Sequence, residues 1–143
     1  MKIPTKVNAL RLQLVSDLHL EFLNKEQVEE IADRILYKTF VDVLILSGDI
    51  CSLSSKSIDN FYTFLDAIKN SYPDIIYVLG NHEYYGTSKQ EVHELGYKLS
   101  RYYFNFHILE NSSLVLRDVT FYGTTLWFKE TIEASLMRYS LND

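Results

Sequence analysis

A chain of 143 residues has the length of one domain with its own hydrophobic core. With 47% hydrophobic and 23% charged residues, the composition is that of a globular protein and excludes a disordered or low-complexity chain. The net charge of −5 disfavours a nucleic-acid groove, which needs clustered Lys and Arg. An anionic substrate would therefore need a local positive centre, and a bound metal ion could supply it.

Cys51 is the single cysteine, so the chain holds no internal disulfide and suits a reducing compartment. The first residues lead into a charged, alternating segment and lack the apolar stretch of a secretion signal. The most apolar run, from Val41 to Leu46, is interrupted by Asp42 and is too short to span a membrane. We therefore predict a cytoplasmic protein with no membrane partner.

Three apolar segments rich in β-branched residues are predicted to form strands, at residues 10–15, 41–46 and 75–79. Each of these segments stops abruptly at a polar motif. Continuous apolar runs of this length are typical of strands that are buried on both faces, as in a parallel sheet.

Two amphipathic segments between these strands are predicted to form helices. The first follows a capping box of Asn24 and Gln27 and carries apolar residues at helical spacing as far as Phe40. The second starts near Ile58, and Pro73 is expected to close it. Strands and helices thus alternate as two βαβ units, which predicts an α/β fold with a parallel βαβαβ core and right-handed crossovers.

A third helix is predicted after His82, because Ser88 and Glu91 form another capping box before an apolar stripe. Short strands follow, at residues 106–109, 113–116 and 120–123, and a turn at Arg117 and Asp118 joins the last two. The tail from Glu130 to Asp143 is amphipathic, so we expect a C-terminal helix that runs to the final residue. No linker divides the chain, which predicts a single domain over residues 1–143.

Polar residues of ligand type stand at the ends of the three predicted parallel strands. They are Asp17 and His19 after the first strand, Asp49 after the second, and Asn81 and His82 after the third. Parallel strands end at one edge of the sheet, about 4.8 Å apart, so these side chains are expected to converge. Carboxylate, imidazole and amide oxygen ligands suit Mn, Fe, Zn or Ni.

Each motif by itself has an ordinary structural explanation. An Asp-x-His sequence arises often by chance, and both Gly48-Asp49 and Gly80-Asn81 are common turn sequences. Turns, however, have no need of the histidines. The joint occurrence of the three motifs at consecutive strand ends therefore favours a metal site over three unrelated turns.

In their order and in the apolar segments that precede them, these motifs resemble the first three motifs of the calcineurin-like metallophosphoesterase family. The matching residues are Asp17-Leu18-His19, Gly48-Asp49 and Gly80-Asn81-His82-Glu83. The segment from Gly123 to Trp127 is also similar to one found in small bacterial and viral members. The resemblance implies a partial metallophosphoesterase-type α/β sandwich and the hydrolysis of a phosphate-ester substrate.

The resemblance further implies a centre of two divalent metal ions, for which manganese is our first choice. Asp17 and His19 would ligate the first ion, Asp49 would bridge both ions, and Asn81 would bind the second through its amide oxygen. These roles agree with the chemistry, because two neighbouring ions activate water and neutralise the phosphoryl oxygens in an in-line displacement.

His82 is implied to hydrogen-bond the phosphate and to act as the catalytic acid that protonates the leaving oxygen. It follows the ligand Asn81 directly but is not needed as a ligand, which suits a general acid. Glu83 is expected to orient or tune His82.

The family's later motifs supply three more histidine ligands, one alone and two in a Gly-His-x-His segment, and this sequence contains neither. Of its four histidines only His93 and His107 remain, and we expect structural roles for both, one on the surface of the third helix and one in a strand. We therefore predict a domain truncated at its C-terminus. Self-association or a downstream chain would then complete the site.

Two other functions compete with the metal-dependent phosphoesterase. A non-catalytic scaffold or interaction protein could retain half of the fold, and the residues encoded after Asp143 would discriminate, since a Gly-His-x-His segment there would favour the enzyme. A metal-independent, Asp-based phosphatase is weaker, because its chemistry normally needs a second aspartate two residues after Asp17, where His19 stands.

Overall fold

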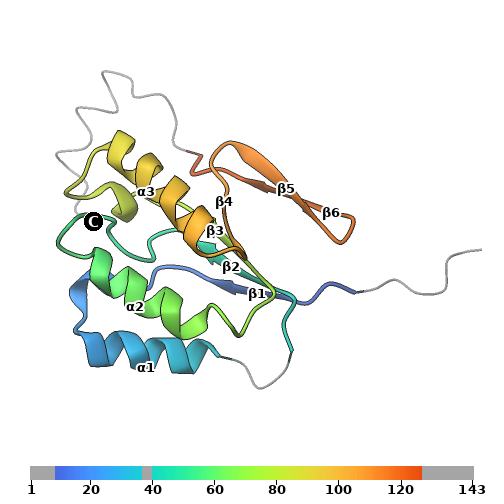
Figure 1. Cartoon of the computed structure of the whole chain (residues 1–143), viewed down its shortest axis with the longest axis horizontal. Coiled ribbons are helices and arrows are strands. Elements are labelled where there is room, and N and C mark those ends of the chain that lie inside the picture. Colours follow the sequence, from blue (N-terminus) through green and yellow to red (C-terminus); the bar gives the residue numbers. More distant parts are fainter. Residues whose placement is uncertain (1–8, 37–39, 127–143) are drawn as a thin grey trace, which may run out of the picture.

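The computed structural model describes residues 9–36 and 40–126 and has three layers (Figure 1). A parallel sheet lies in the middle, helices cover one face of it, and an antiparallel hairpin lies on the other. The strands of the sheet are β1 (Leu12–Val15), β2 (Val43–Ser47), β3 (Asp74–Val78) and β4 (Phe106–Ile108). The hairpin consists of β5 (Ser112–Leu116) and β6 (Val119–Gly123). The helices are α1 (Lys25–Ile35), α2 (Ile58–Ile68) and α3 (Lys89–Tyr102), with short 3₁₀ helices η1 (Leu20–Phe22) and η2 (His82–Tyr84).

The strand order in the sheet is β1-β2-β3-β4, and all neighbours are parallel. This confirms the α/β fold and the βαβαβ core predicted from the alternation of apolar segments. The structure adds a third βαβ unit, because β4 pairs in parallel with β3 and places Phe106 opposite Ile75. The sequence predicts the β4 strand but not its partner, since three residues carry too little pattern to define a register.

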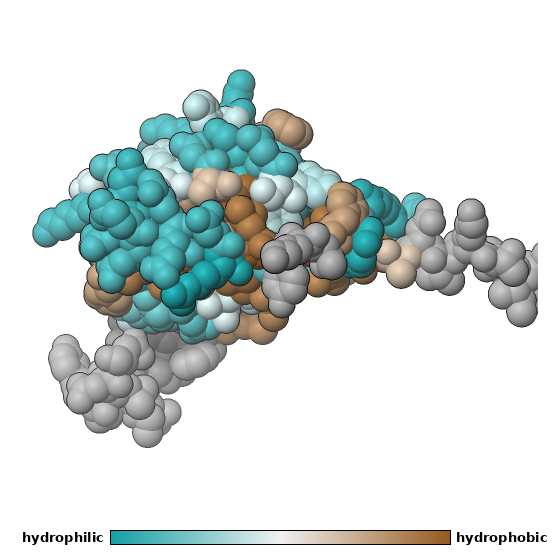
Figure 2. All heavy atoms as spheres, turned by 90° about the horizontal axis from the view of Figure 1, so that it is seen from below, coloured by the Kyte–Doolittle hydropathy of each residue, from teal (hydrophilic) through white to brown (hydrophobic). Residues whose placement is uncertain are grey.

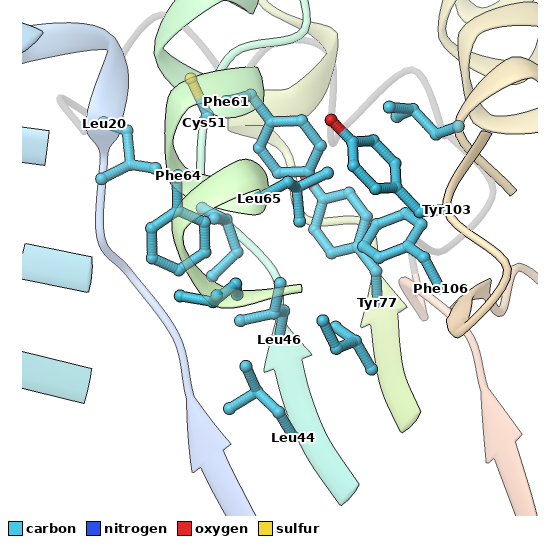
Figure 3. Close-up of a cluster of buried hydrophobic side chains, with 14 of the residues drawn as sticks. Leu20, Leu44, Leu46, Cys51, Phe61, Phe64, Leu65, Tyr77, Tyr103 and Phe106 are labelled. Carbon is cyan, nitrogen blue, oxygen red and sulfur yellow. The ribbon is translucent and has the colours of Figure 1, made fainter. Parts of the chain in front are cut away.

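The main core lies between the sheet and the three helices. Alternate strand residues such as Leu44, Leu46 and Tyr77 point to this side and are completely buried. Figure 3 shows them beneath the aromatic residues of α2, where the ring of Phe61 stacks on Tyr77 with a centroid separation of 5.2 Å. Burial of so many large side chains on one face holds the carboxyl ends of β1, β2 and β3 in fixed relative positions.

The opposite face of the sheet is covered only in part. Val43 and Ile76 are buried there beneath apolar residues of the hairpin, such as Leu114. On β1, Leu12 and Leu14 lie opposite Val43 and Ile45 in the parallel register, and so point to the same face. Their side chains remain 50% and 67% exposed, because the hairpin does not reach across β1.

Helix α1 begins as predicted and ends earlier. Asn24 Oδ1 accepts from the backbone N–H of Gln27, and Gln27 Oε1 accepts from that of Asn24, which confirms the capping box. The extension of the helix to Phe40 is wrong. The helix stops at Ile35, and Phe40 is 54% exposed with its ring 4.7 Å from the Arg11 guanidinium. The C-cap residue Leu36 has an extended backbone, with φ −64° and ψ 104°, which ends the helical conformation.

Helix α2 has the predicted start, but Pro73 does not close it. The helix ends at Ile68, because residues 69–73 form the turn that leads into β3. Tyr72 in this turn is buried, and its hydroxyl donates to the carbonyl of Ile35 at 3.0 Å. The turn therefore packs the end of α2 against the end of α1.

The second half of the described chain follows the predicted elements closely. The capping box of Ser88 and Glu91 begins α3, and β5 and β6 start within one residue of their predicted positions. Arg117 and Asp118 between them both have positive φ, 47° and 66°, as a tight hairpin turn requires. Trp127 and the helix expected from Glu130 to Asp143 lie outside the described residues.

The face on the α1 side of the molecule, seen in Figure 2, is dominated by hydrophilic residues, and hydrophobic residues show at its centre and rim. Amphipathic α1 turns its charged side outward there. Within residues 9–36 and 40–126, no helix has the length and apolar character needed to cross a membrane.

Candidate metal centre

The residues predicted as ligands lie in the loops at the carboxyl edge of the sheet. Asp17, Asp49 and Asn81 follow β1, β2 and β3 by two or three residues. The loops after β1 and β2 remain hydrogen-bonded beyond the strands, with Asp17 N donating to Gly48 O and His19 N to Asp49 O, both at 3.1 Å. The first two motifs are therefore held side by side by their backbones.

The backbone at this edge is in a conformation that most residues avoid. Asp17, His19 and Asp49 have φ values of 56°, 47° and 53°, in the left-handed region, and Gly48 has 82°. Non-glycine residues in this region cost free energy and persist where the surrounding structure enforces them, often at functional sites. Here the left-handed residues turn the chain sharply after β1 and β2 at the positions that carry the predicted ligands.

Three side chains form a group with the spacing of a metal site. His19, Asp49 and His82 each offer a ligand atom, and these atoms lie within 4.8 Å of one another. Asp49 also accepts a hydrogen bond from the backbone N–H of His82 at 3.0 Å, which fixes its carboxylate. Asp17 is exposed, and its carboxylate does not belong to this compact group.

The side chain of Asn81 also faces Asp49. When its amide nitrogen points inward, it donates to the two carboxylate oxygens of Asp49 at 3.1 and 3.2 Å. In the opposite orientation the amide oxygen faces these oxygens, an approach of acceptors that a cation between them would stabilise. Tyr85 Oη lies 2.9 Å from the other end of the amide and can donate or accept, so this contact is kept in both orientations. Together with the carboxylate of Asp49 and the imidazole of His19, the amide oxygen makes a set of oxygen and nitrogen donors of the kind that divalent cations bind.

Glu83 is completely buried beneath the site. Its carboxylate accepts from the backbone N–H groups of Asp49, Ile50 and Gly80 at 3.1, 2.9 and 2.8 Å, and from Tyr77 Oη at 2.7 Å. Burial raises the pKa of Glu83, against the effect of these hydrogen bonds. Glu83 thus holds the loop after β2 against the loop after β3. The carboxylate that contacts the His82 ring, the role expected of Glu83, belongs to another residue.

That residue is Glu21, which the sequence analysis does not identify. Its Oε1 lies 2.7 Å from His82 Nδ1 and 3.5 Å from His19 Nδ1, and its side chain is 7% exposed. A signal is present in the sequence, because Asp17, His19 and Glu21 alternate with leucines after β1. This alternation identifies Glu21 as part of the site only once the position of His82 is known.

Cys51 lies beside the site but offers no thiolate. It is completely buried, and burial together with the carboxylates of Glu21 and Glu83 raises its pKa to about 12. Thiolate, not thiol, is the nucleophile and ligand form of cysteine. The same carboxylates add negative charge around Asp49, and this negative electrostatic potential favours the binding of a cation.

Aromatic rings border the two histidines. The ring of Tyr85 lies 4.5 Å from that of His82, and the 73% exposed Phe22 lies 6.2 Å from both His19 and His82. The two imidazoles are themselves 4.2 Å apart in an edge-to-face arrangement. The site therefore opens at a surface that is partly aromatic.

The remaining histidines are placed as the sequence analysis expects. His93 is exposed on α3. His107 lies in β4, where its Nε2 is 2.9 Å from Asp74 Oδ1 on the neighbouring strand. Neither residue belongs to the group around Asp49.

Comparisons with known proteins find a matching family and similar sequences. A model of the calcineurin-like phosphoesterase family matches residues 10–136. An uncharacterized protein of Acanthamoeba polyphaga mimivirus is 33% identical over 125 residues, which cover 81% of this chain and 44% of that protein. An uncharacterized metallophosphoesterase of Campylobacter jejuni is 28% identical over 126 residues, which cover 86% of this chain and 31% of that protein. The chain thus spans less than half the length of both curated relatives.

A solved structure shares the fold. The phosphopantetheinyl hydrolase of Mycobacterium tuberculosis superposes with a TM-score of 0.56 over 75% of this chain and 38% of that protein, at 21% sequence identity. At this level of identity the likeness concerns the arrangement of strands and helices.

Proposed function

The chain belongs to the calcineurin-like phosphoesterase family, and from this premise we propose that it hydrolyses a phosphate ester with the help of divalent metal ions. The observation that carries the proposal is the group of His19, Asp49 and His82 at the carboxyl edge of the sheet, with ligand atoms within 4.8 Å of one another. A site of this kind binds the anionic phosphoryl group despite the net charge of −5.

The proposed ligands are those that the family resemblance implies. Asp17 and His19 would hold one ion, Asn81 a second, and Asp49 both. When bound, such ions activate water and neutralise charge on the phosphoryl oxygens. Manganese and a cytosolic setting are parts of this proposal, and the free thiol of Cys51 agrees with a reducing compartment.

His82 is proposed as the acid that protonates the leaving oxygen. Its ring reaches the same point as His19 and Asp49, so two roles compete, ligand and acid. The contact between its Nδ1 and Glu21 at 2.7 Å occupies that nitrogen, because a nitrogen that donates to a carboxylate has no lone pair for a metal ion. His82 would act on the ester through its other nitrogen.

An assay of phosphate release tests the proposal. Purified protein with Mn²⁺ would be given p-nitrophenyl phosphate and bis(p-nitrophenyl) phosphate, which separates monoesterase from diesterase activity. We expect turnover that EDTA abolishes, that Asp49→Asn abolishes, and that His82→Ala lowers without loss of Mn²⁺ binding. Glu29→Gln, an exposed change on α1, is the matched control. Mn²⁺-independent turnover, or turnover retained in Asp49→Asn, would contradict the proposal.

The rate of the 143-residue chain by itself is expected to be low. The second ion would have only Asp49 and Asn81 as ligands, and a displacement of about 1 Å in a reacting group already costs on the order of a hundredfold in rate. Calorimetry with Mn²⁺ should accordingly find at most one tight site per chain, lost in Asp49→Asn. Two tight ions in a monomer would require further ligands. Adding the additional segment present in the longer relatives, in cis or as a separate chain, should raise the rate. If both forms bind no metal and remain inactive, a non-catalytic scaffold is the better explanation.

A further inference from the structure

The side chain of Glu21 joins three loops of the site although it is not among the proposed ligands. Its Oε1 lies 2.7 Å from Nδ1 of His82, in the loop after β3, and its Oε2 accepts from the backbone N–H of Ser52, in the loop after β2, at 3.2 Å. We propose that Glu21 is a positioning residue that fixes the ring of His82 and determines which nitrogen it presents to the substrate. This inference rests on the proposed function of the site.

The backbone around Glu21 is held firmly. Leu20 is completely buried and its N–H donates to the carbonyl of Ile50 at 2.9 Å. On the other side, Asn60 of α2 donates through Nδ2 to the carbonyls of Leu20 and Leu23, both at 2.8 Å. A carboxylate with 7% exposure, fixed backbone and a partner on each oxygen has one orientation, and it imposes that orientation on His82.

The contact also determines where the hydrogen of the imidazole lies. A carboxylate oxygen only accepts, so His82 Nδ1 carries the hydrogen in a contact of 2.7 Å. Nε2 is then the ring nitrogen that faces the ester: a proton bound at Nε2 passes to the leaving oxygen, and the ring is left as the Nδ1–H tautomer. A free imidazole in water distributes its hydrogen over both nitrogens, and the partner of one nitrogen selects the tautomer.

The need for such a residue follows from the closeness of His19. Its Nδ1 lies 3.2 Å from His82 Nδ1, so without a third group the two rings would pair with each other. Glu21 Oε1 is nearer to His82 Nδ1 than His19 Nδ1 is, at 2.7 Å against 3.2 Å, so His82 Nδ1–H donates its hydrogen bond to Glu21. It thereby keeps the imidazole of His82 from pairing with that of His19, and Glu21→Ala should allow His82 to rotate toward His19.

The first test uses metal-free protein and does not depend on activity. Long-range ¹H–¹⁵N correlation spectra of the imidazole rings report which nitrogen of His82 is protonated. We expect Nδ1–H in the wild type, a shift toward the Nε2–H tautomer in Glu21→Ala, and an intermediate result in Glu21→Gln, whose amide oxygen can still accept. Glu29→Gln should leave the spectrum unchanged. An Nε2–H tautomer in the wild type, or an unchanged spectrum in Glu21→Ala, would overturn the inference.

The second test measures kcat on two monoesters with Mn²⁺. An alkyl phosphate needs a proton on its leaving oxygen, whereas p-nitrophenyl phosphate releases a stable phenolate. Glu21→Ala should lower kcat on the alkyl ester about tenfold to a hundredfold, the loss typical of removing the hydrogen-bond partner of a histidine in a metal site. We expect a smaller loss on the aryl ester and unchanged Mn²⁺ affinity. Glu21→Gln should recover part of the loss.

The outcomes separate this inference from the proposed function. Equal losses on both esters, or weaker Mn²⁺ binding in Glu21→Ala, would overturn it by showing that Glu21 supports the metal or the fold. If the wild type hydrolyses neither of these monoesters nor bis(p-nitrophenyl) phosphate, the proposed function fails, and the imidazole spectra still decide whether Glu21 positions His82. Thermal unfolding of each variant identifies one that does not fold, and the more conservative Glu21→Gln then carries the comparison.

Discussion

The carboxylate of Asp49 occupies the space that a side chain at Gly80 would need. A Cβ atom at Gly80 would lie 2.2 Å from Asp49 Oδ1 and 2.6 Å from the backbone nitrogen of Asp49, closer than real Cβ atoms come. The absence of a side chain at position 80 therefore allows the loop after β3 to approach the loop after β2. It brings Asn81 and His82 to the carboxylate that the proposed function makes the bridging ligand.

Replacing Gly80 should accordingly damage both stability and metal binding. Gly80→Ala forces either the Asp49 carboxylate or the loop backbone to move, and overpacking of this kind costs about 1–3 kcal/mol. We expect a lower unfolding temperature and loss of Mn²⁺ binding in calorimetry. Gly96→Ala is the control, because its Cβ would meet only the flexible end of Ile108 and alanine favours the helix. Wild-type Mn²⁺ affinity in Gly80→Ala would show that the close approach is unnecessary.

Glu83 is expected to be a determinant of stability. Each carboxylate oxygen of Glu83 accepts two hydrogen bonds, so in Glu83→Gln the NH₂ group must replace one oxygen and face two donors. The better position for the NH₂ group is beside Tyr77, because the Tyr77 hydroxyl can turn and accept a hydrogen bond from it. The backbone N–H of Ile50 then loses its partner. An unpaired buried donor costs about 1–3 kcal/mol, which urea unfolding would detect. Tyr77→Phe, which removes one donor and leaves none unpaired, should cost less. The reverse order would mean that the Tyr77 hydroxyl, not the carboxylate, holds the two loops together.

The thiol of Cys51 should be inert in the folded protein. Its pKa of about 12 leaves almost no thiolate at pH 8, and the side chain is completely buried. Incubation with a thiol reagent should therefore modify no cysteine under native conditions and one per chain in urea. Fast labelling of the native protein would mean that the loop after β2 opens readily, since reaction requires exposure of the sulfur.

Asp42 should make the attachment of the hairpin sensitive to acid. Its carboxylate pairs with Arg117 in the hairpin turn and accepts from the backbone N–H of Arg11 at 2.9 Å. That backbone hydrogen bond, helped by Arg117 and opposed by burial, lowers the pKa of Asp42 below 3.8. The stabilisation is therefore present above pH 3.8 and is lost as the pH falls through the lower pKa of the folded state.

Hydrogen exchange of the β5 and β6 amides, followed from about pH 5 to about pH 2 and corrected for intrinsic rates, would measure this loss of protection. In Asp42→Asn the hairpin should exchange faster at the upper end of the range and show a weaker dependence on pH. An identical pH dependence in both proteins would assign the acid sensitivity to another carboxylate.

Local patterns in the sequence determined much of this protein. Capping boxes at Asn24 and Ser88 begin α1 and α3, because a cap satisfies backbone donors within a few residues of itself. The apolar runs that end at Ser47 and Val78 form adjacent parallel strands, since continuous apolar sequence is stable only when buried on both faces. The order of the polar motifs along the chain therefore sufficed to predict one shared edge of the sheet, with Asp49 at its centre.

Tertiary structure alone decided which side chains meet there. The contact of Glu21 with His82 joins residues 61 positions apart. Three of the four hydrogen bonds of Glu83 come from backbone N–H groups of the loops that fold over its carboxylate, and the fourth comes from Tyr77 in β3. Neither interaction follows from a periodic pattern, because irregular loops take their conformations from the packing around them. Asp17 illustrates the same limit, since its place after β1 was predictable, whereas the exposed position of its carboxylate depends on a left-handed backbone turn. Periodicity specifies which residues face a core, and only packing in three dimensions specifies which polar atoms come within hydrogen-bonding distance of one another.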